Sequence, residues 1–266
     1  MTVAQMQKGF ARSISSLILP ILVLIVSLGG VVLLQLPRAN QETSNLTKEE
    51  ALKEEQQKQL RLNVLRQLPT FGYDNLLANW IFLDFIQYYG DGASRNLTGN
   101  SLTSNYFETV INKDPRFVGA YLILAPATSL FGGDPTQSVA LMNEGLQYVT
   151  PQTDLAYQIW IYKALDETLF LGDYETAQHS YETAANWALY HDTDLARIAA
   201  QRSRETAAFL ATNPDGRLVQ ASAWMTVYTN ARDDQTRELA LQKMEQLGAE
   251  VIITPNRITV RMPEEE

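Results

Sequence analysis

The sequence predicts an all-α protein, in which a single N-terminal transmembrane helix precedes a helical-repeat domain (an α-α superhelix) and a small C-terminal β-hairpin. Three observations lead to this fold class. The 23 residues from Ile14 to Leu36 include no charged side chain and are mostly Leu, Ile and Val. Beyond them, apolar residues recur at helical spacing between turns that contain Gly, Asp and Pro. Only the stretch 251–260 changes to short runs of β-branched residues.

Residues 1–37 are expected to form a membrane anchor. Each Leu, Ile or Val contributes about −0.3 to −0.6 kcal/mol on an insertion scale, so the run 14–36 outweighs its few Pro, Gly and Gln residues. A cleaved signal peptide is the alternative, but its apolar region is typically only about 7–15 residues long. Lys8 and Arg12 precede the run and other bases follow it among acids. The basic-residue rule therefore favours, weakly, a domain on the lumenal or periplasmic side.

The charge distribution excludes several classes of partner and chemistry. All 30 acids and 19 of the 21 bases lie from Arg38 onward, which gives this part a net charge of −11. Such a surface repels polyanions, which argues against nucleic acid and against anionic lipid as partners. The sequence contains no Cys, so disulfides, thiolate nucleophiles and Cys-ligated zinc are excluded.

Residues 38–68 predict a polar linker and a juxtamembrane helix. Thr47 and Glu50 have the spacing of a capping box, which marks the start of the helix. Leu60, Val64 and Leu68 recur at a spacing of four in its second half, so we expect this end to dock onto the domain. The charged first half is interpreted as a solvated face, and a partner-binding stalk is the alternative.

Residues 69–249 are interpreted as a series of helices. The helix at 75–89 has a wide apolar face whose aromatic residues are expected to fill a core rather than to bind a ligand. A polar loop is expected from Gly92 to Leu102, and a kink is expected at Pro126. Further helices are predicted at 103–113, 117–131, 138–146, 154–170, 177–190, 194–210, 218–230 and 234–247. In the helix that ends at Leu210, Leu195 and Ile198 are expected to face inward.

A degenerate repeat runs through the middle helices. Its best-preserved member is the turn and helix from Leu171 to Ala184. A small residue, a bulky one four positions on and a small one three further on recur as Thr103-Phe107-Val110, Ser138-Met142-Gly145 and Ala177-Tyr181-Ala184. The first members are 35 and 39 residues apart. A tetratricopeptide repeat (TPR) has about 34 residues, so a TPR-like domain is predicted, with a generic helical bundle as the alternative.

Residues 250–266 are expected to form a hairpin and an acidic tail. Val251–Thr254 and Arg257–Val260 are rich in β-branched residues and flank Pro255-Asn256. Two strands alone are marginally stable, so the hairpin is expected either to pack on the last helices or to pair with the sheet edge of a partner.

Four stretches carry a family resemblance. They are Phe71-Gly72-Tyr73-Asp74-Asn75-Leu76-Leu77-Ala78-Asn79-Trp80, Gln87-Tyr88-Tyr89-Gly90-Asp91, Asp114-Pro115-Arg116-Phe117 and Ala120-Tyr121. On these stretches the chain resembles membrane-anchored tetratricopeptide-type proteins of cyanobacteria over most of its length from Leu68 on. The resemblance implies a helical-repeat domain on a thylakoid or plasma-membrane anchor that serves the assembly or repair of photosynthetic complexes. It implies no catalytic residues.

The sequence contains few groups that support catalysis. His179 and His191 are twelve residues apart and do not form an i, i+4 ligand pair, so no metal site is predicted. The turn Gly132–Pro135 lacks the Lys of a phosphate-binding loop. Asp166 and Glu167 are adjacent, so on a helix they point in different directions. No catalytic residue and no cofactor is assigned, and the chain is not expected to be an enzyme. A hydrolase with an acid pair assembled by the fold is the remaining enzymatic alternative.

The function expected from these features is a membrane-tethered protein–protein interaction module that acts as an assembly, repair or scaffolding factor. A constitutive structural subunit of a membrane complex is the alternative. In a helical-repeat domain the first helices of the pairs line a concave groove, and Tyr162, Asp166 and Phe170 are expected to face it and bind a partner protein. The expected contacts are other proteins and, through Ile14 to Leu36, the bilayer.

Overall fold

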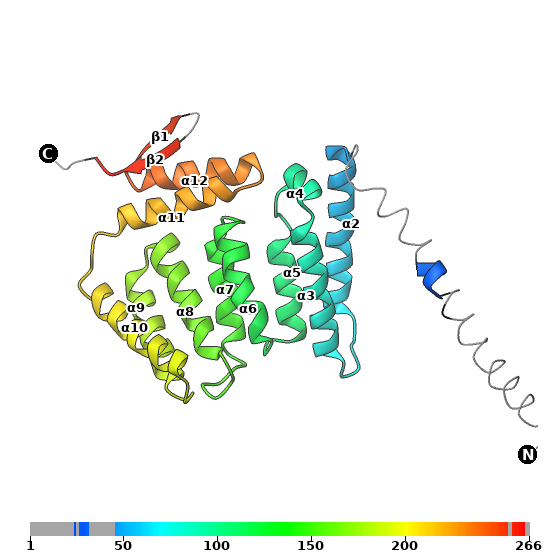
Figure 1. The fold of residues 1–266 in the computed structure, drawn as a ribbon, viewed down its shortest axis with the longest axis horizontal. Coiled ribbons are helices and arrows are strands. Elements are labelled where there is room, and N and C mark those ends of the chain that lie inside the picture. Colours follow the sequence, from blue (N-terminus) through cyan, green and yellow to red (C-terminus); the bar gives the residue numbers. More distant parts are fainter. Residues whose placement is uncertain (1–23, 25–26, 32–45, 255–256, 264–266) are drawn as a thin grey trace, which may run out of the picture. The chain divides into compact units, whose positions relative to one another are not determined.

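The computed structural model describes residues 24, 27–31, 46–254 and 257–263 (Figure 1). The chain divides into two compact units, Met1–Leu46 and Thr47–Glu266. Most of the predicted membrane span, Ile14 to Leu36, lies outside the described residues. Among the helices within those residues, none is both long and apolar enough to cross a membrane. The anchor and its orientation therefore stay predictions, and the second unit is described below by itself.

The second unit is mostly helical and ends in a two-stranded antiparallel sheet, which confirms the predicted fold class at this level. Its first helices are α2 (Lys48–Gln67), α3 (Asp74–Gly90), α4 (Gly92–Thr98), α5 (Thr103–Lys113) and α6 (Val118–Ala125). The next are α7 (Pro135–Gly145), α8 (Ala156–Asp166), α9 (Tyr174–Ala188) and α10 (Asp194–Leu210). The last elements are α11 (Arg217–Asn230), α12 (Asp234–Gln246), β1 (Glu250–Thr254) and β2 (Arg257–Arg261).

Helices that are close in sequence pack side by side in a row that runs from α2 to α10 (Figure 1). In this row α5 contacts α2, α3 and α7, whereas α9 packs between α8 and α10. The pair α11 and α12 lies across the row at one end of its helices (Figure 1). Because α2 belongs to this compact unit, the predicted boundary at residue 68 does not separate it from the helices that follow.

Two π-helical segments extend helices of the row. The segment η1 (Pro126–Leu130) continues α6, and η2 (Glu167–Leu171) continues α8 until Gly172, which has a left-handed φ of 66°. Proline has no N–H to donate within a helix. At Pro126 the chain adopts a wider helical turn, in which Phe131 N–H donates to the Pro126 carbonyl oxygen at 3.2 Å. The helix therefore continues through the proline.

The start of α2 follows the sequence prediction, but its packing face does not. The Thr47 side chain accepts from Glu50 N–H at 3.3 Å, and the Glu50 carboxylate accepts from Thr47 N–H at 3.0 Å, which confirms the capping box. The predicted docking stripe is wrong, because Leu60, Val64 and Leu68 are 66%, 59% and 44% exposed. The buried face instead holds Ala51, Glu55 and Leu62. The buried carboxylate of Glu55, which pairs inside the domain, sets the orientation of α2. Helical spacing alone does not reveal that a charged residue is on the buried face.

The three repeat triplets form buried packing faces. All nine of their residues are buried, in α5 (Thr103, Phe107, Val110), in α7 (Ser138, Met142, Gly145) and in α9 (Ala177, Tyr181, Ala184). The bulky members of the first two triplets, Phe107 and Met142, belong to one hydrophobic core with residues of α3, α6 and α8. This confirms the predicted packing role of the small and bulky positions.

Gly145 is the tightest of these positions, and it yields a stability prediction. A Cβ at Gly145 would overlap the hydroxyl group of the buried Tyr121, which donates to the Pro115 carbonyl oxygen at 2.9 Å. Overpacking of this kind costs about 1–3 kcal/mol, so Gly145→Ala is expected to lower the urea midpoint of unfolding by a corresponding amount. Gly90→Ala is a matched control, since Gly90 is also helical and has nothing within 4 Å. Equal midpoints for the two variants would contradict the prediction.

The C-terminal hairpin packs on the last helices. Glu250 pairs with Arg261 and Val251 with Val260 in antiparallel register. The side chains of Val251 and Val260 join a hydrophobic cluster with Trp224 of α11 and Met244 of α12. Of the two placements expected for the hairpin, the structure shows the one against its own helices. The predicted turn at 255–256 and the end of the acidic tail lie outside the described residues.

Candidate functional site

The three residues predicted to face a groove are packed among helices. Asp166 is 4% exposed, and Tyr162 packs against the main core. The ring of Phe170 lies edge-on to Trp224 of α11, with the centroids 5.4 Å apart. The expected open groove around these residues is therefore not what the structure shows. Helix α11 crosses over η2 and covers Phe170. The spacing of residues within 154–170 cannot predict that a later helix packs there. Their role in partner binding stays a prediction.

Asp166 is the acceptor of a buried hydrogen bond between two helices. Ser129 Oγ, in η1, donates to Asp166 Oδ2 at 2.7 Å, and both residues are buried. Burial raises the pKa of Asp166 to about 7, because desolvation disfavours the ionised carboxylate. The hydroxyl groups of Ser129 and Ser138 act in the opposite direction, and the charge of Glu167 raises the pKa further. An acid and a hydroxyl at this distance suit proton transfer, but their burial leaves a substrate no access.

Glu167 points to a different neighbour, as predicted for adjacent acids on a helix. Lys163 Nζ donates to its carboxylate, and Ser180 Oγ of α9 donates to Glu167 Oε2 at 2.7 Å. Lys163 Nζ also donates to Ser180 Oγ at 2.9 Å. The side chains of Lys163 and Glu167 are 5% and 2% exposed, so this ion pair is buried with its hydrogen bonds satisfied. The cluster connects α8 to α9 and is closed to solvent.

A second buried ion pair joins α2 to α3, to α4 and to the loop that follows α4. Arg95 Nη1, in α4, donates to Glu55 Oε1 of α2 at 3.0 Å and to the Gly99 carbonyl oxygen at 2.7 Å. The Arg95 guanidinium carbon lies 3.8 Å from the centroid of the Tyr88 ring, a cation–π geometry. Tyr88 and Ser101 donate to the same Glu55 oxygen, at 3.0 and 2.7 Å. This cluster was missed by sequence reasoning, which predicted a polar loop where α4 forms.

The histidines occupy separate positions. His191 Nε2 lies 3.0 Å from the Pro151 carbonyl oxygen, and its ring packs beside Tyr157. His179 lies edge-on to Trp160, with the ring centroids 6.4 Å apart. Within the part of the chain that the structure describes, no group of three or more His, Cys, Asp or Glu residues could hold a metal ion.

The most prominent exposed feature is an apolar surface on α2, α3 and the turn between them. We call it the α2–α3 surface and define it by apolar side chains that are at least 44% exposed: Leu60, Val64, Leu68, Phe71, Tyr73, Leu76, Trp80, Leu83 and Ile86. Phe71 is 89% exposed at the tip of the turn. Arg61 of α2 connects the two helices, since it pairs with Asp84 and lies over the Trp80 ring at 5.6 Å. The helices α2 and α3 that carry these side chains lie at one end of the row (Figure 1).

A smaller group of exposed apolar residues lies on α10. Leu195 and Ile198, which were predicted to face inward, are 76% and 49% exposed, so this prediction is wrong. Ala207 and Leu210, which were predicted to face inward as well, are buried, and Ala196 and Ala200 take the buried positions in the first half of the helix. The small alanines allow α9 and α10 to approach closely, which turns the larger residues outward.

Comparison of the chain with models of protein families, with curated proteins and with solved structures finds no match.

Proposed function

We propose that this protein is a membrane-tethered, TPR-like interaction module that serves as an assembly, repair or scaffolding factor for a membrane complex. The observation that carries the proposal is the α2–α3 surface. Exposed apolar side chains that gather on neighbouring helices of a folded domain are typical of interaction sites. A surface of this composition is suited to binding and not to a reaction.

The position of the surface indicates its occupant. In a row of stacked helices each helix covers the apolar face of its neighbour, and a terminal helix needs a polar outer face to remain soluble. Here the outer faces of α2 and α3 are apolar, since they expose Leu60, Val64, Leu76 and Leu83. We infer that the occupant is an apolar or amphipathic helix of a partner protein, which lies along α2 and α3 as a further helix of the row would.

The expected location of the partner follows from the tether. The apolar run 14–36 precedes α2 by eleven residues, 37–47, which span at most about 40 Å when extended. On this proposal the domain stays close to a bilayer and meets partners that belong to the same membrane. The family resemblance supports a thylakoid or plasma membrane and a photosynthetic complex. The basic-residue rule favours the lumenal or periplasmic side for the domain.

Substitutions on the two exposed faces test the proposal. Leu76→Glu combined with Leu83→Glu places two charges on the α2–α3 surface, where burial against a partner helix would desolvate them. We expect this variant to leave the high-mass complexes that contain the protein on native gels of gently solubilised membranes. The matched control, Leu195→Glu combined with Ile198→Glu on α10, is expected to stay in them.

Both variants are expected to unfold at the wild-type temperature, because all four side chains are exposed. A photo-crosslinker at position 83, and not one at position 195, is expected to give a single discrete adduct with a membrane protein. Retention of the Leu76/Leu83 variant in the complexes, with no adduct at position 83, would contradict the proposed surface.

The alternative function is a constitutive structural subunit of a membrane complex. The same gels separate the two proposals by stoichiometry. A permanent subunit migrates with the mature complex at a fixed, stoichiometric ratio. An assembly factor is present at less than one copy per complex and migrates with assembly intermediates. The apolar α2–α3 surface is compatible with both functions, since obligate interfaces are also apolar.

A further inference from the structure

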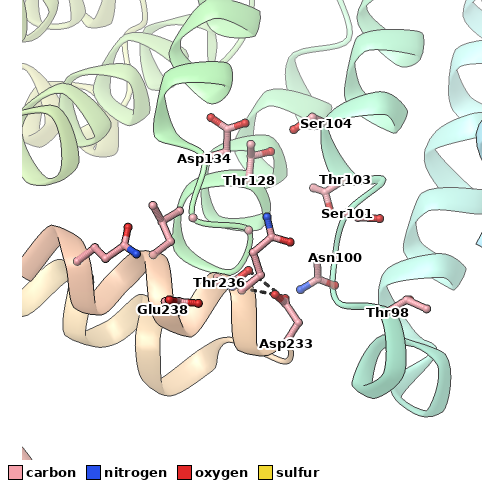
Figure 2. Close-up of a pocket in the computed structure, with 15 residues that line it drawn as sticks. Thr98, Asn100, Ser101, Thr103, Ser104, Thr128, Asp134, Asp233, Thr236 and Glu238 are labelled. Carbon is pink, nitrogen blue, oxygen red and sulfur yellow. Dashed lines mark hydrogen bonds between the residues drawn. The ribbon is translucent and has the colours of Figure 1, made fainter. Parts of the chain in front are cut away.

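The C-terminal hairpin lies at the periphery of the domain. The α11–α12 pair lies between the hairpin and the row of helices (Figure 1). On the side of the row, α12 lines a polar cavity together with the loop from Thr98 to Ser104 and the turn from Thr128 to Asp134 (Figure 2). On the other side, Val251 and Val260 of the hairpin pack on α11 and α12. The face of the hairpin opposite these helices is called its outer face.

Each strand of the hairpin has a neighbouring strand on one side only. Strand β1 pairs with β2 in antiparallel register, and the sheet contains no third strand among the described residues. An edge strand presents backbone N–H and C=O groups that can pair with a strand of another chain. The hairpin therefore has two edges at which a further strand can add, one along β1 and one along β2.

The two edges differ in how they are protected. Natural edge strands commonly carry charged residues or Pro, which prevent pairing with another chain. Strand β2 begins with Arg257 and ends with Arg261. Strand β1 carries a charge only at Glu250, and the residues from Val251 to Thr254 are uncharged and include no Pro or Gly. The edge along β1 is therefore the less protected one.

Ile252 gives β1 an exposed apolar side chain. Because side chains alternate between the two faces of a strand, Ile252 belongs to the outer face when Val251 packs on the helices. The side chain of Ile252 is 39% exposed, and the residue opposite it on β2 is the small, polar Thr259. A further strand beside β1 would cover Ile252 with a side chain on the same face.

We propose that β1 pairs with β1 of a second copy of this chain, antiparallel and centred on Ile252, so that two hairpins form one four-stranded sheet. A two-fold axis then places Ile252 opposite its counterpart and Glu250 opposite Thr254. No like charges meet in this register, and the two exposed isoleucines cover each other. The equivalent pairing of two β2 strands would set Arg257 opposite Arg261, and like charges in opposite positions are destabilising.

Pairing of β1 with β2 of another copy is the competing arrangement. It would set Glu250 opposite Arg261, as in the hairpin itself. Within the hairpin Arg261 Nε already donates to Glu250 Oε2 at 2.7 Å, and both side chains are exposed, so a second such pair adds little. This arrangement leaves a free edge at each end and extends into filaments, whereas the β1–β1 pairing closes after two copies.

Single-cysteine variants test the register, because the chain contains no Cys of its own. In the proposed sheet the two copies of residue 252 lie opposite each other with Cα atoms about 4.5–5.5 Å apart, which suits a disulfide. Mild oxidation of the full chain in detergent, at less than one chain per micelle, is expected to give a reducible dimer with Ile252→Cys.

Thr259→Cys is the matched control, because Thr259 lies opposite Ile252 within the hairpin. In the proposed sheet its two copies are three strand spacings apart, about 14 Å, which is too far for a disulfide. We expect no dimer from this variant. If Ile252→Cys does not fold, a mixture of Glu250→Cys and Thr254→Cys reports the same register, since these two positions are also opposite each other across the axis.

Charge substitutions test the contact by sedimentation equilibrium of the full chain. Ile252→Lys and Ile252→Glu each place like charges on the two-fold axis, so each dimer is expected to dissociate about tenfold more readily than the wild type. An equimolar mixture of the two variants is expected to recover the dimer, because opposite charges then meet. Both variants are expected to unfold at the wild-type temperature, because Ile252 is exposed.

Three results would overturn the proposal. The first is a wild-type chain that sediments as a monomer throughout the micromolar range. The second is the absence of a disulfide dimer with Ile252→Cys, or equal dimer formation with Thr259→Cys. The third is a disulfide that forms only when these two variants are mixed, because it would assign the contact to β1 and β2 of different copies.

Discussion

Replacing Arg95 with Leu is expected to lower the free energy of unfolding by about 3–5 kcal/mol, because removal of one partner leaves the other charge buried and unpaired. Glu55, the unpaired partner, is 6% exposed and would retain only the hydroxyl groups of Tyr88 and Ser101 as donors. The cation–π contact with Tyr88 and the hydrogen bond to the Gly99 carbonyl oxygen disappear in the same variant.

The effect is expected to be largest in α2. This helix buries only Ala51, Glu55 and Leu62, so its contacts with the domain are few, and the pair with Arg95 is the buried one among its ion pairs. Amide hydrogen exchange should therefore accelerate in 48–67 more than in α9 or α10. Because α2 contributes Leu60 and Val64 to the α2–α3 surface, the variant is also expected to lose binding at that surface without any change to its exposed residues.

Urea unfolding measures the loss, and two other variants act as controls. The double variant Arg95→Leu with Glu55→Leu removes both charges and is expected to recover much of the lost stability. Arg197→Leu breaks an ion pair with Asp192 and Asp194 whose side chains are 56% to 100% exposed, so no measurable change is expected. A loss as large in the double variant as in Arg95→Leu would show that side-chain packing, and not the unpaired charge, dominates.

The sequence predicted those features that depend on nearby residues. The capping box at Thr47 and Glu50 is formed by contacts within one turn, and the small and bulky positions of α5, α7 and α9 follow from helical spacing. The hairpin at the C-terminus follows from its β-branched residues. In each case the determinant and the structure lie within a few residues of one another.

Features that depend on distant residues were not predictable in this way. Glu55 and Arg95 are 40 residues apart, and nothing in the spacing of either indicates their pairing. The same limit applies to Phe170, which packs on Trp224, and to the cavity that α12 closes over Thr128. The candidate surface was missed for a related reason: the stripe at Leu60 and Val64 was assigned to the interior, because helical spacing shows which residues share a face and not what covers it.

Asp166 is expected to make the stability of the protein depend on pH. The pKa of Asp166 is about 7 in the folded protein, against an ordinary value of 3.8, so between these values the folded state binds a proton that the unfolded state has lost. The stabilisation from this proton is complete below about pH 4 and is lost as the pH rises through about 7. At about 1.4 kcal/mol for each pH unit, Asp166 lowers the free energy of unfolding by about 4 kcal/mol between pH 4 and pH 7.

Asp166→Asn removes this titration. The Asn side chain keeps an oxygen that accepts from Ser129 Oγ, and its amide can donate to the neighbouring, buried Ser138 Oγ. Relative to the wild type, the variant is therefore expected to gain stability as the pH rises from 4 to 8, by up to about 4 kcal/mol. Urea unfolding at pH 5 and pH 8, followed by Trp fluorescence, measures this change.

Asp154→Asn is the control, because Asp154 is exposed and its difference from the wild type is expected to be the same at both pH values. Lys163→Met tests the neighbouring cluster, since the loss of this cation leaves Glu167 with only Ser180 as a donor. We expect that variant to be destabilised more at pH 8 than at pH 5, because Asp166 and Glu167 then both carry charge in the same buried region. If Asp166→Asn differs from the wild type by the same free energy at pH 5 and at pH 8, Asp166 does not titrate in this range and burial does not control its charge.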